Sequence, residues 1–204
     1  MSPADALDRL NADELRLACA NQRIGNCVQV VTETTSTNDL VLQMAAEHEE
    51  GLVVFAERQT AGRGQYGNRW ESAAHKGLWL SILLRPKGPL ADASRLTTWA
   101  AQTVADTIQE HLSLNATIKS PNDVYLGERK VAGVLLEMRA VDEAPHVGIL
   151  GIGINVNQTS EDFPGVIKLK AASLAMAIGR RVDRQQLALA LLQRLDRTYR
   201  VFAL

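Results

Sequence analysis

Hydrophobic residues recur along the chain in short strand-like runs and in longer runs with helical spacing. The helical period is clearest over 94–112, where apolar positions such as Leu96, Trp99 and Val104 fall on one face. The predicted helices are 11–20, 39–46, 94–112 and 184–202, and the predicted strands are 27–34, 51–59, 77–86, 116–120, 124–140 as a hairpin, and 146–158. This mixed order favours an α+β domain, with helices packed on a mixed or antiparallel sheet, over a doubly wound parallel sheet.

Start and stop signals support these elements. Asn11 with Glu14 three residues later is a capping-box pattern at the start of the first helix. Ser36 or Thr37 is a candidate cap for the second helix. The turn of the hairpin falls on 126–129, which has a glycine at the bend.

Composition limits the classes of protein that fit. The 204 residues are 46% hydrophobic, which is enough for one domain with a sizeable core. The net charge of −1 disfavours a nucleic-acid binder, which usually carries a basic balance or stripe. No apolar run approaches the ~20 residues of a membrane helix, and the N-terminus has no signal-peptide core. A cytoplasmic protein is therefore expected. Neither the two cysteines nor the four histidines have metal-ligand spacing, so we expect no zinc site.

The segment 59–70, QTAGRGQYGNRW, combines glycines with basic and aromatic residues. Glycines allow a backbone to approach a ligand closely and to direct several N–H groups at an anion. Arg63 adds a planar donor for phosphate or carboxylate oxygens. The spacing is not a Walker A loop, and its G-x-G-x-x-G leads to Trp70 and a strand instead of opening a helix. The alternative is a plain surface loop; we expect the loop to be mobile when empty and to fold over a ligand.

Three other clusters carry polar groups. The first, 119–123 (KSPND), is followed by Lys130 within an apolar strand. A lysine directed inward needs an anion, but Lys130 can equally end a hairpin turn and face water. The second, 35–38 (TSTN), can cap a helix, bind a ligand, or do both. The third, 151–157 (GIGINVN), fits a closely packed central strand that ends in a polar turn.

Together and in this order, these motifs resemble the biotin protein ligase family. The resemblance covers about 23–202, and its most specific part is GRGxxGxxW paired with PND-x(6)-K-x-x-G. It implies the class II synthetase-like catalytic domain of biotin and lipoate ligases. Lipoate ligases and octanoyltransferases are similar in fold but lack this combined signature.

The resemblance implies an ATP-dependent attachment of biotin to one lysine of a biotin carboxyl carrier protein through biotinyl-5′-AMP. The biotin carboxylate is itself the first nucleophile, so no Ser, Cys or His nucleophile is needed, and none stands out. Positive charge and N–H donors around the α-phosphate are needed. Magnesium, with biotin and ATP as substrates, would neutralise phosphate oxygens.

The resemblance also assigns roles to individual residues. The expected biotin contacts are Ser36, Thr37, Asn38, Gln59, Arg63, Gly64, Gln65 and Lys130; the expected nucleotide contacts are Arg63, Arg69, Lys119, Asn122 and Asn155, and the expected catalytic residues are Lys130, Arg63 and Asp123. Asp123 is a candidate to deprotonate or orient the carrier lysine. The protein is not expected to hold a metal by itself; Mg²⁺ would arrive with ATP, near Asn122.

The chain also departs from the family pattern. Family members commonly have arginine at the positions of Gln65 and Asn68, and they usually have tryptophan at the position of Ser120. We expect a single catalytic domain over 1–204, without the family's N-terminal helix-turn-helix, without DNA binding, and without its small C-terminal β-barrel. A homodimer is compatible with the family. The alternatives are a non-catalytic biotin or biotinyl-adenylate binding protein, favoured by Gln65 and the missing barrel, and lipoate or octanoate transfer on the same fold.

Overall fold

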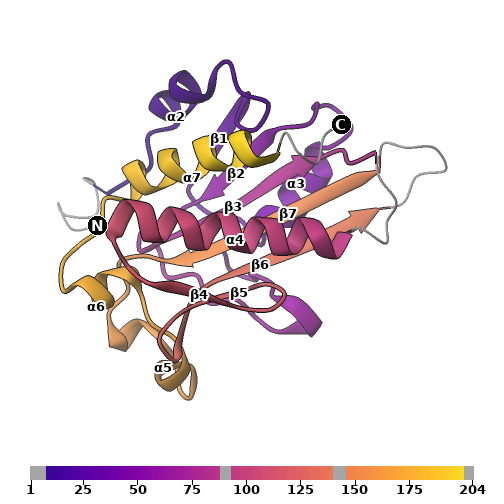
Figure 1. Cartoon of the computed structure of the whole chain (residues 1–204). Helices are drawn as coiled ribbons and strands as arrows, with labels where there is room; N and C mark the ends of the chain where they lie inside the picture. The colour runs from indigo at the N-terminus through magenta and orange to yellow at the C-terminus, as the bar shows by residue number, and fades with distance from the viewer. Residues whose placement is uncertain (1–7, 88–92, 140–145, 200–204) are drawn as a thin grey trace.

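The fold is built on one mixed sheet of seven strands (Figure 1). The computed structural model describes residues 8–87, 93–139 and 146–199. The strands are β1 (Cys27–Val31), β2 (Leu52–Ala56), β3 (Gly77–Leu84), β4 (Ala116–Lys119), β5 (Asp123–Leu126), β6 (Arg129–Arg139) and β7 (Val147–Asn155). Their order across the sheet is β1-β2-β3-β7-β6-β5-β4. Strands β1 and β2 run parallel, and the other neighbouring pairs in the described ranges run antiparallel.

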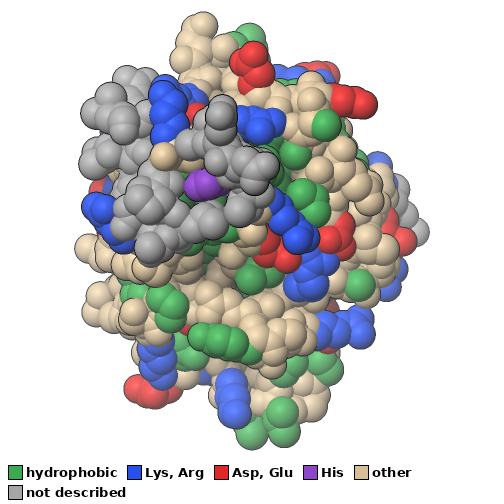
Figure 2. Space-filling model, turned by 90° about the vertical axis from the view of Figure 1, so that its right-hand side faces the viewer, with side chains coloured by type: hydrophobic (Ala, Val, Ile, Leu, Met, Phe, Trp, Pro, Cys, Tyr) green, Lys and Arg blue, Asp and Glu red, His purple; other side chains and the backbone are tan. Residues whose placement is uncertain are grey.

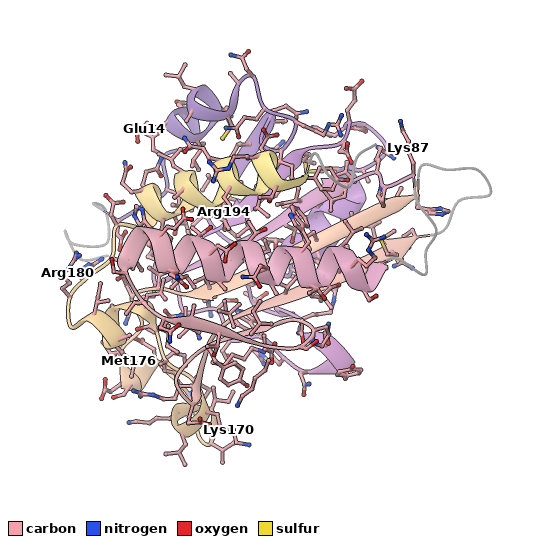
Figure 3. All side chains as sticks on the ribbon, in the orientation of Figure 1. Glu14, Lys87, Lys170, Met176, Arg180 and Arg194 are labelled. Atoms are coloured by element: carbon pink, nitrogen blue, oxygen red, sulfur yellow. The ribbon has the colours of Figure 1, made fainter. Side chains whose placement is uncertain are left out.

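Helices cover the two faces of the sheet unequally. They are α2 (Ala12–Cys19), α3 (Thr37–Met44), α4 (Ala93–Leu112), α5 (Ile167–Lys170), α6 (Leu174–Ile178) and α7 (Arg184–Tyr199), with short 3₁₀ turns at Gln65–Gly67 and Ser160–Asp162. In Figure 1, α4 and α7 cross the front face side by side, and α3 lies behind the sheet. Arg194 of α7 lies against α4 (Figure 3), where it pairs with Glu110 and, at 3.6 Å, with Asp106. Within the described ranges, no helix has the length and apolar character needed to cross a bilayer.

The hydrophobic core is divided by the sheet. In β2, Val53 and Phe55 join the large cluster under α4 and α7, while Leu52 and Val54 join a small cluster under α3. Alternate side chains of a strand point to opposite faces, so β2, β3 and β7 each contribute to both clusters. The larger cluster fills the α4/α7 face, and the second face keeps room beside α3.

A buried ion pair joins the start of α7 to the sheet. Arg184 is fully buried. Its guanidinium donates to Glu57 Oε2 at 2.6 and 2.8 Å, to the carbonyl of Gly77 at 3.0 Å and to the carbonyl of Asp8 at 2.6 Å. Glu57 also accepts the N–H of Leu10 at 2.8 Å. These contacts attach α7, the N-terminal segment and two strands at one point.

The sequence-based prediction of an α+β fold is confirmed, with differences in detail. Asn11 caps α2 as expected, through the N–H groups of Asp13 and Glu14. Ser36 occupies the N-cap position of α3, but its side chain makes no capping hydrogen bond. The parallel β1–β2 pair and the short helices α5 and α6 were not predicted. The predicted end of the last helix, 200–202, lies outside the described residues.

Candidate active site

A pocket lies on the second face of the sheet, at the N-terminal end of α3. It has an empty volume of about 450 Å³, part of which is open to solvent. Its walls come from the start of α3, the glycine-rich loop, and strands β3, β6 and β7. The lining residues are Ser36, Thr37, Asn38, Gln59, Arg63, Gly64, Gln65, Trp70, Leu80, Asn122, Lys130, Gly133, Val134, Leu135, Gly151, Ile152 and Gly153.

Small residues on adjacent strands make the floor of this pocket. Ser81 of β3 pairs with Gly151 of β7, and Gly153 of β7 pairs with Gly133 of β6. A Cβ atom at Gly151 would lie 2.4 Å from Asn38 Oδ1, and one at Gly153 would lie 2.5 Å from Trp70 Cε2. The alternating glycines of 151–153 therefore let two polar or aromatic groups lie directly on the sheet.

We expect Gly153→Ala to displace Trp70 and to cost about 1–3 kcal/mol of unfolding free energy, as overpacking does. Gly148→Ala is the matched control on the same strand, because the nearest atom to its new methyl would be the flexible Met138 Sδ at 3.1 Å, and Leu84 and Leu136 would be at ordinary contact distances of 3.6 and 3.7 Å. Urea denaturation gives the stabilities, and near-ultraviolet circular dichroism reports the environment of the tryptophans. Equal stability and equal spectra for the two variants would contradict the role given to Gly153.

Neutral hydrogen-bonding groups form the buried end of the pocket. Gln59 Oε1 accepts from the N–H and the hydroxyl of Thr37 at 2.8 and 3.0 Å. Ser81 Oγ lies 2.7 Å from Thr37 Oγ1 and 2.5 Å from Asn38 Oδ1. Thr37, Asn38 and Ser81 are buried, so these groups are fixed in orientation before any ligand arrives. This end suits a compact polar ligand group with both donors and acceptors.

Arg63 is one of two cations that line the pocket. Its Nη1 donates to both oxygens of Asp39 at 2.6 and 2.7 Å, and its Nη2 donates to Glu137 at 2.9 and 3.2 Å. The hydrogen bond to Asp39 raises the pKa of Arg63 above its ordinary value; partial burial opposes this and Glu137 adds to it. Glu137 also accepts from Asn38 Nδ2 at 2.6 Å. Glu137 therefore connects the neutral end of the pocket to the arginine.

Lys130 is the second cation. Its Nζ lies 2.6 Å from Asp123 Oδ1 and 5.3 Å from the centre of the Trp70 ring. The Lys130 side chain is only 29% exposed, so the alternative of a lysine that simply faces water is wrong. Asp123 is not among the lining residues, but it reaches the pocket through this pair.

The glycine-rich loop is folded on itself. The N–H of Gly64 donates to the carbonyl of Asn68 at 2.7 Å, and the N–H of Trp70 donates to the carbonyl of Gly62 at 2.9 Å. In this conformation these two amides are not available for an anion cradle, and Arg63 is the loop's cation in the pocket. Tyr66 at the tip is 93% exposed. Mobility of the empty loop stays a prediction.

The other predicted residues divide into two groups. Ser36, Gln65, Gly64 and Asn122 line the pocket, and Asn122 Nδ2 donates to the carbonyl of Val134 at 3.2 Å. Arg69, Lys119 and Asn155 do not line it. Lys119 lies over the Tyr125 ring at 4.2 Å, Arg69 pairs with Glu71 at 3.3 Å, and Asn155 is buried, donating to the carbonyl of Ala172 at 3.1 Å. Their nucleotide contacts stay predictions.

Sequence reasoning missed the residues that support the pocket. Asp39, Ser81 and Glu137 lie at helix or strand positions with no motif of their own. A polar residue within an apolar strand was the only available signal, and it applied to both Ser81 and Glu137. Among the described residues, no three His, Cys, Asp or Glu side chains gather as a metal site.

The fold and the pocket define a small-molecule-binding α+β domain, and comparisons with known proteins give its family. Residues 28–155 match the biotin/lipoate A/B protein ligase family. The bifunctional ligase/repressor BirA of Bacillus spizizenii is 35% identical over 193 residues, which are 94% of this chain and 59% of that protein. The biotin–[acetyl-CoA-carboxylase] ligase of Mycobacterium tuberculosis is 33% identical over 83% of this chain and 62% of its own length.

A solved structure extends the likeness to three dimensions. The biotin protein ligase from Aquifex aeolicus in complex with biotin and ATP superposes with a TM-score of 0.76 and 33% identity, over 87% of this chain and 72% of that one. The chain belongs to the biotin/lipoate A/B protein ligase family. It spans about 59% of the length of the Bacillus relative.

Proposed function

We propose that the chain is an ATP-dependent ligase that joins biotin to a lysine of a biotin carboxyl carrier protein, by way of biotinyl-5′-AMP. The observation that carries the proposal is a pocket with a buried neutral end and a second end lined by two cations. Thr37, Asn38 and Gln59 offer fixed donors and acceptors for the urea-like ring of biotin. Arg63 and Lys130 offer charge for its carboxylate. The relatives named as biotin ligases support the same substrate.

In the first step, an oxygen of the biotin carboxylate attacks the α-phosphorus of ATP, and the bond to the β-phosphate breaks to release pyrophosphate. The chain needs no nucleophile of its own for this step. Arg63 and Lys130 line one pocket, where they can hold the carboxylate and stabilise the negative charge that builds up on the α-phosphate. Trp70 and the loop line the same pocket, where they would limit the access of water to a bound acyl-adenylate.

Magnesium would enter as the partner of ATP. Mg²⁺ is commonly held by one or two carboxylates together with substrate phosphates. The described residues near Lys130 offer the Asn122 side chain, and they offer the Asp123 carboxylate only in its pair with Lys130. This donor set fits an ion held mainly by phosphate oxygens, whose chemistry would be to neutralise phosphate charge.

In the second step, the amine of the carrier lysine attacks the acyl carbon, the bond from that carbon to the AMP oxygen breaks, and the amine loses a proton. Asp123 is our candidate to orient or deprotonate this amine. We expect Asp123→Asn to slow transfer from preformed biotinyl-adenylate by about 10²-fold, as loss of a general base does. A single-turnover measurement with purified adenylate isolates the step. Full transfer speed in Asp123→Asn would remove Asp123 from this role.

The test of the proposed function is incubation of the chain with biotin, MgATP and a carrier domain. Intact mass of the carrier reports transfer, and pyrophosphate release reports activation. A carrier that gains one biotin supports the ligase. Pyrophosphate without modified carrier would mean that this chain activates biotin but does not transfer it. Bound biotin with neither signal would favour the non-catalytic binding protein.

Lipoate and octanoate are the substrates to compare in the same assay. Their long apolar chains would have to cross the polar end formed by Thr37, Asn38 and Ser81, so we expect biotin to be used preferentially.

A cytoplasmic location, where ATP is supplied, is part of the proposal. A homodimer stays a prediction that light scattering can check. Figure 2 shows basic and acidic side chains interspersed on the visible face. The absence of DNA binding stays a prediction.

A further inference from the structure

The cations of the pocket are already neutralised by the chain itself. Asp39 and Glu137 contact Arg63, and Asp123 contacts Lys130. Three carboxylates therefore surround two cations at the place where the proposed function requires an anionic ligand. An added carboxylate or phosphate would face like charges unless one of the protein's carboxylates gives up its cation.

The two partners of Arg63 are not equivalent. Glu137 lies on β6 and is held from a second side by Asn38 Nδ2 at 2.6 Å. Asp39 lies in the first turn of α3, its side chain is 40% exposed, and within the described ranges its side-chain hydrogen bonds are those with Arg63. An exposed carboxylate in the first turn of a helix is stabilised by water and by the helix dipole without a cation. Asp39 can therefore release Arg63 at lower cost than Glu137.

We propose that Asp39 and Glu137 are positioning residues for the reaction, with different tasks. Asp39 holds Arg63 while the pocket is empty and yields the guanidinium to the anionic group of the ligand. Glu137 keeps Arg63 beside the pocket and fixes the amide of Asn38, so that Asn38 Oδ1 faces Ser81. The inference rests on the proposed function for the identity of the anion, but the contact between Arg63 and Asp39 stands on the geometry alone.

Asp39→Asn tests whether Arg63 exchanges Asp39 for the anionic group of the ligand, by comparing a charged ligand with a neutral one. The affinity for biotin and for its neutral carboxamide is measured by calorimetry on the full chain. We expect Asp39→Asn to bind biotin about 3- to 5-fold more tightly, the value of a half-exposed ion pair. The affinity for the carboxamide should not change, because that ligand does not compete for Arg63. Weaker biotin binding, or equal changes for both ligands, would overturn the proposal.

Glu137 is tested by a conservative pair of variants. Glu137→Ala removes the acceptor of Asn38, so both ligands should bind about 10-fold more weakly, the loss of a charge-assisted hydrogen bond. Glu137→Gln keeps an acceptor oxygen for Asn38 and should restore most of the carboxamide binding. A loss of up to about 3-fold relative to the wild type should remain, because a neutral acceptor makes a weaker hydrogen bond than a carboxylate. Equal carboxamide affinity in Glu137→Ala and Glu137→Gln would show that Glu137 does not position Asn38.

A ligand-free measurement separates this inference from the proposed function. Phenylglyoxal modifies accessible arginines, and peptide mass gives the rate at Arg63 with Arg69 as the internal reference. We expect Asp39→Asn to raise the rate at Arg63 several-fold and to leave the rate at Arg69 unchanged. Unchanged rates at both would overturn the proposal. If the rate at Arg63 rises but the wild type binds neither ligand, the empty-state contact is real and the biotin assignment fails.

Discussion

Lys130→Ala is expected to lower the rate of biotinyl-adenylate formation by about 10²- to 10³-fold, the usual effect of removing one preorganised charge-stabilising group. The variant leaves Asp123 without its partner at 2.6 Å, so the pocket loses a cation and keeps the negative charge. An anionic carboxylate and phosphate would then meet an uncompensated carboxylate. Pyrophosphate release with biotin and MgATP measures the step directly, and intact mass of the carrier measures the overall reaction.

Lys87→Ala is the matched control for Lys130→Ala. Lys87 follows the end of β3, points outwards (Figure 3), and does not line the pocket. The same loss of one positive charge there should leave both rates within about twofold, because exposed charges far from the site are screened. Thermal melts of both variants exclude unfolding as the cause. A Lys130→Ala protein as active as Lys87→Ala would refute the catalytic role.

Arg184→Ala is expected to destabilise the fold by about 3–5 kcal/mol, because removal of one partner leaves a buried charge uncompensated. The Glu57 carboxylate would keep the Leu10 N–H and lose both guanidinium hydrogen bonds. For a domain of this size, the loss corresponds to a fall in Tm of roughly 6–20 °C. Urea denaturation followed by circular dichroism gives the free energy of unfolding.

Two further variants make the test of Arg184 specific. Arg180→Ala removes an exposed arginine near the same helix (Figure 3) and should change stability by less than about 0.5 kcal/mol. The double variant Glu57→Gln with Arg184→Met removes both charges together and should regain part of the loss. If Arg184→Ala and Arg180→Ala unfold at the same urea concentration, the buried pair contributes nothing to stability.

The sequence was sufficient to predict the helices and strands in which hydrophobic residues recur at a clear helical or strand spacing. The helix 94–112 and the hairpin 124–140 agree with α4 and with β5 and β6 to within a few residues. The parallel β1–β2 pair was missed because a short apolar run such as that of β2, buried at all five positions, does not record the direction of its neighbour. The helices α5 and α6 are four and five residues long, too short for a helical period to appear.

The site residues that belong to a sequence motif were predictable, and those brought to the pocket only by the folding of the chain were not. The predicted residues Thr37, Asn38, Gln59, Arg63 and Lys130 do meet in one pocket. The ion pairs of Arg63 with Asp39 and Glu137 were not predictable, because they join residues 24 and 74 positions apart. The burial of Arg184 was not predictable either, since it depends on how α7 meets Gly77 at the start of β3 and Glu57 after the end of β2.

The division of the sheet into two faces has a consequence for how this domain can change. The large hydrophobic cluster lies on the α4/α7 face, while the floor of the pocket, Gly133, Gly151 and Gly153, lies on the other. Along the same strands, residues that line the pocket thus alternate with residues that pack in the large hydrophobic cluster. Substitutions of pocket-lining residues can therefore change the preferred ligand without altering the large cluster, except at Gly151 and Gly153, where an added side chain would displace Asn38 or Trp70.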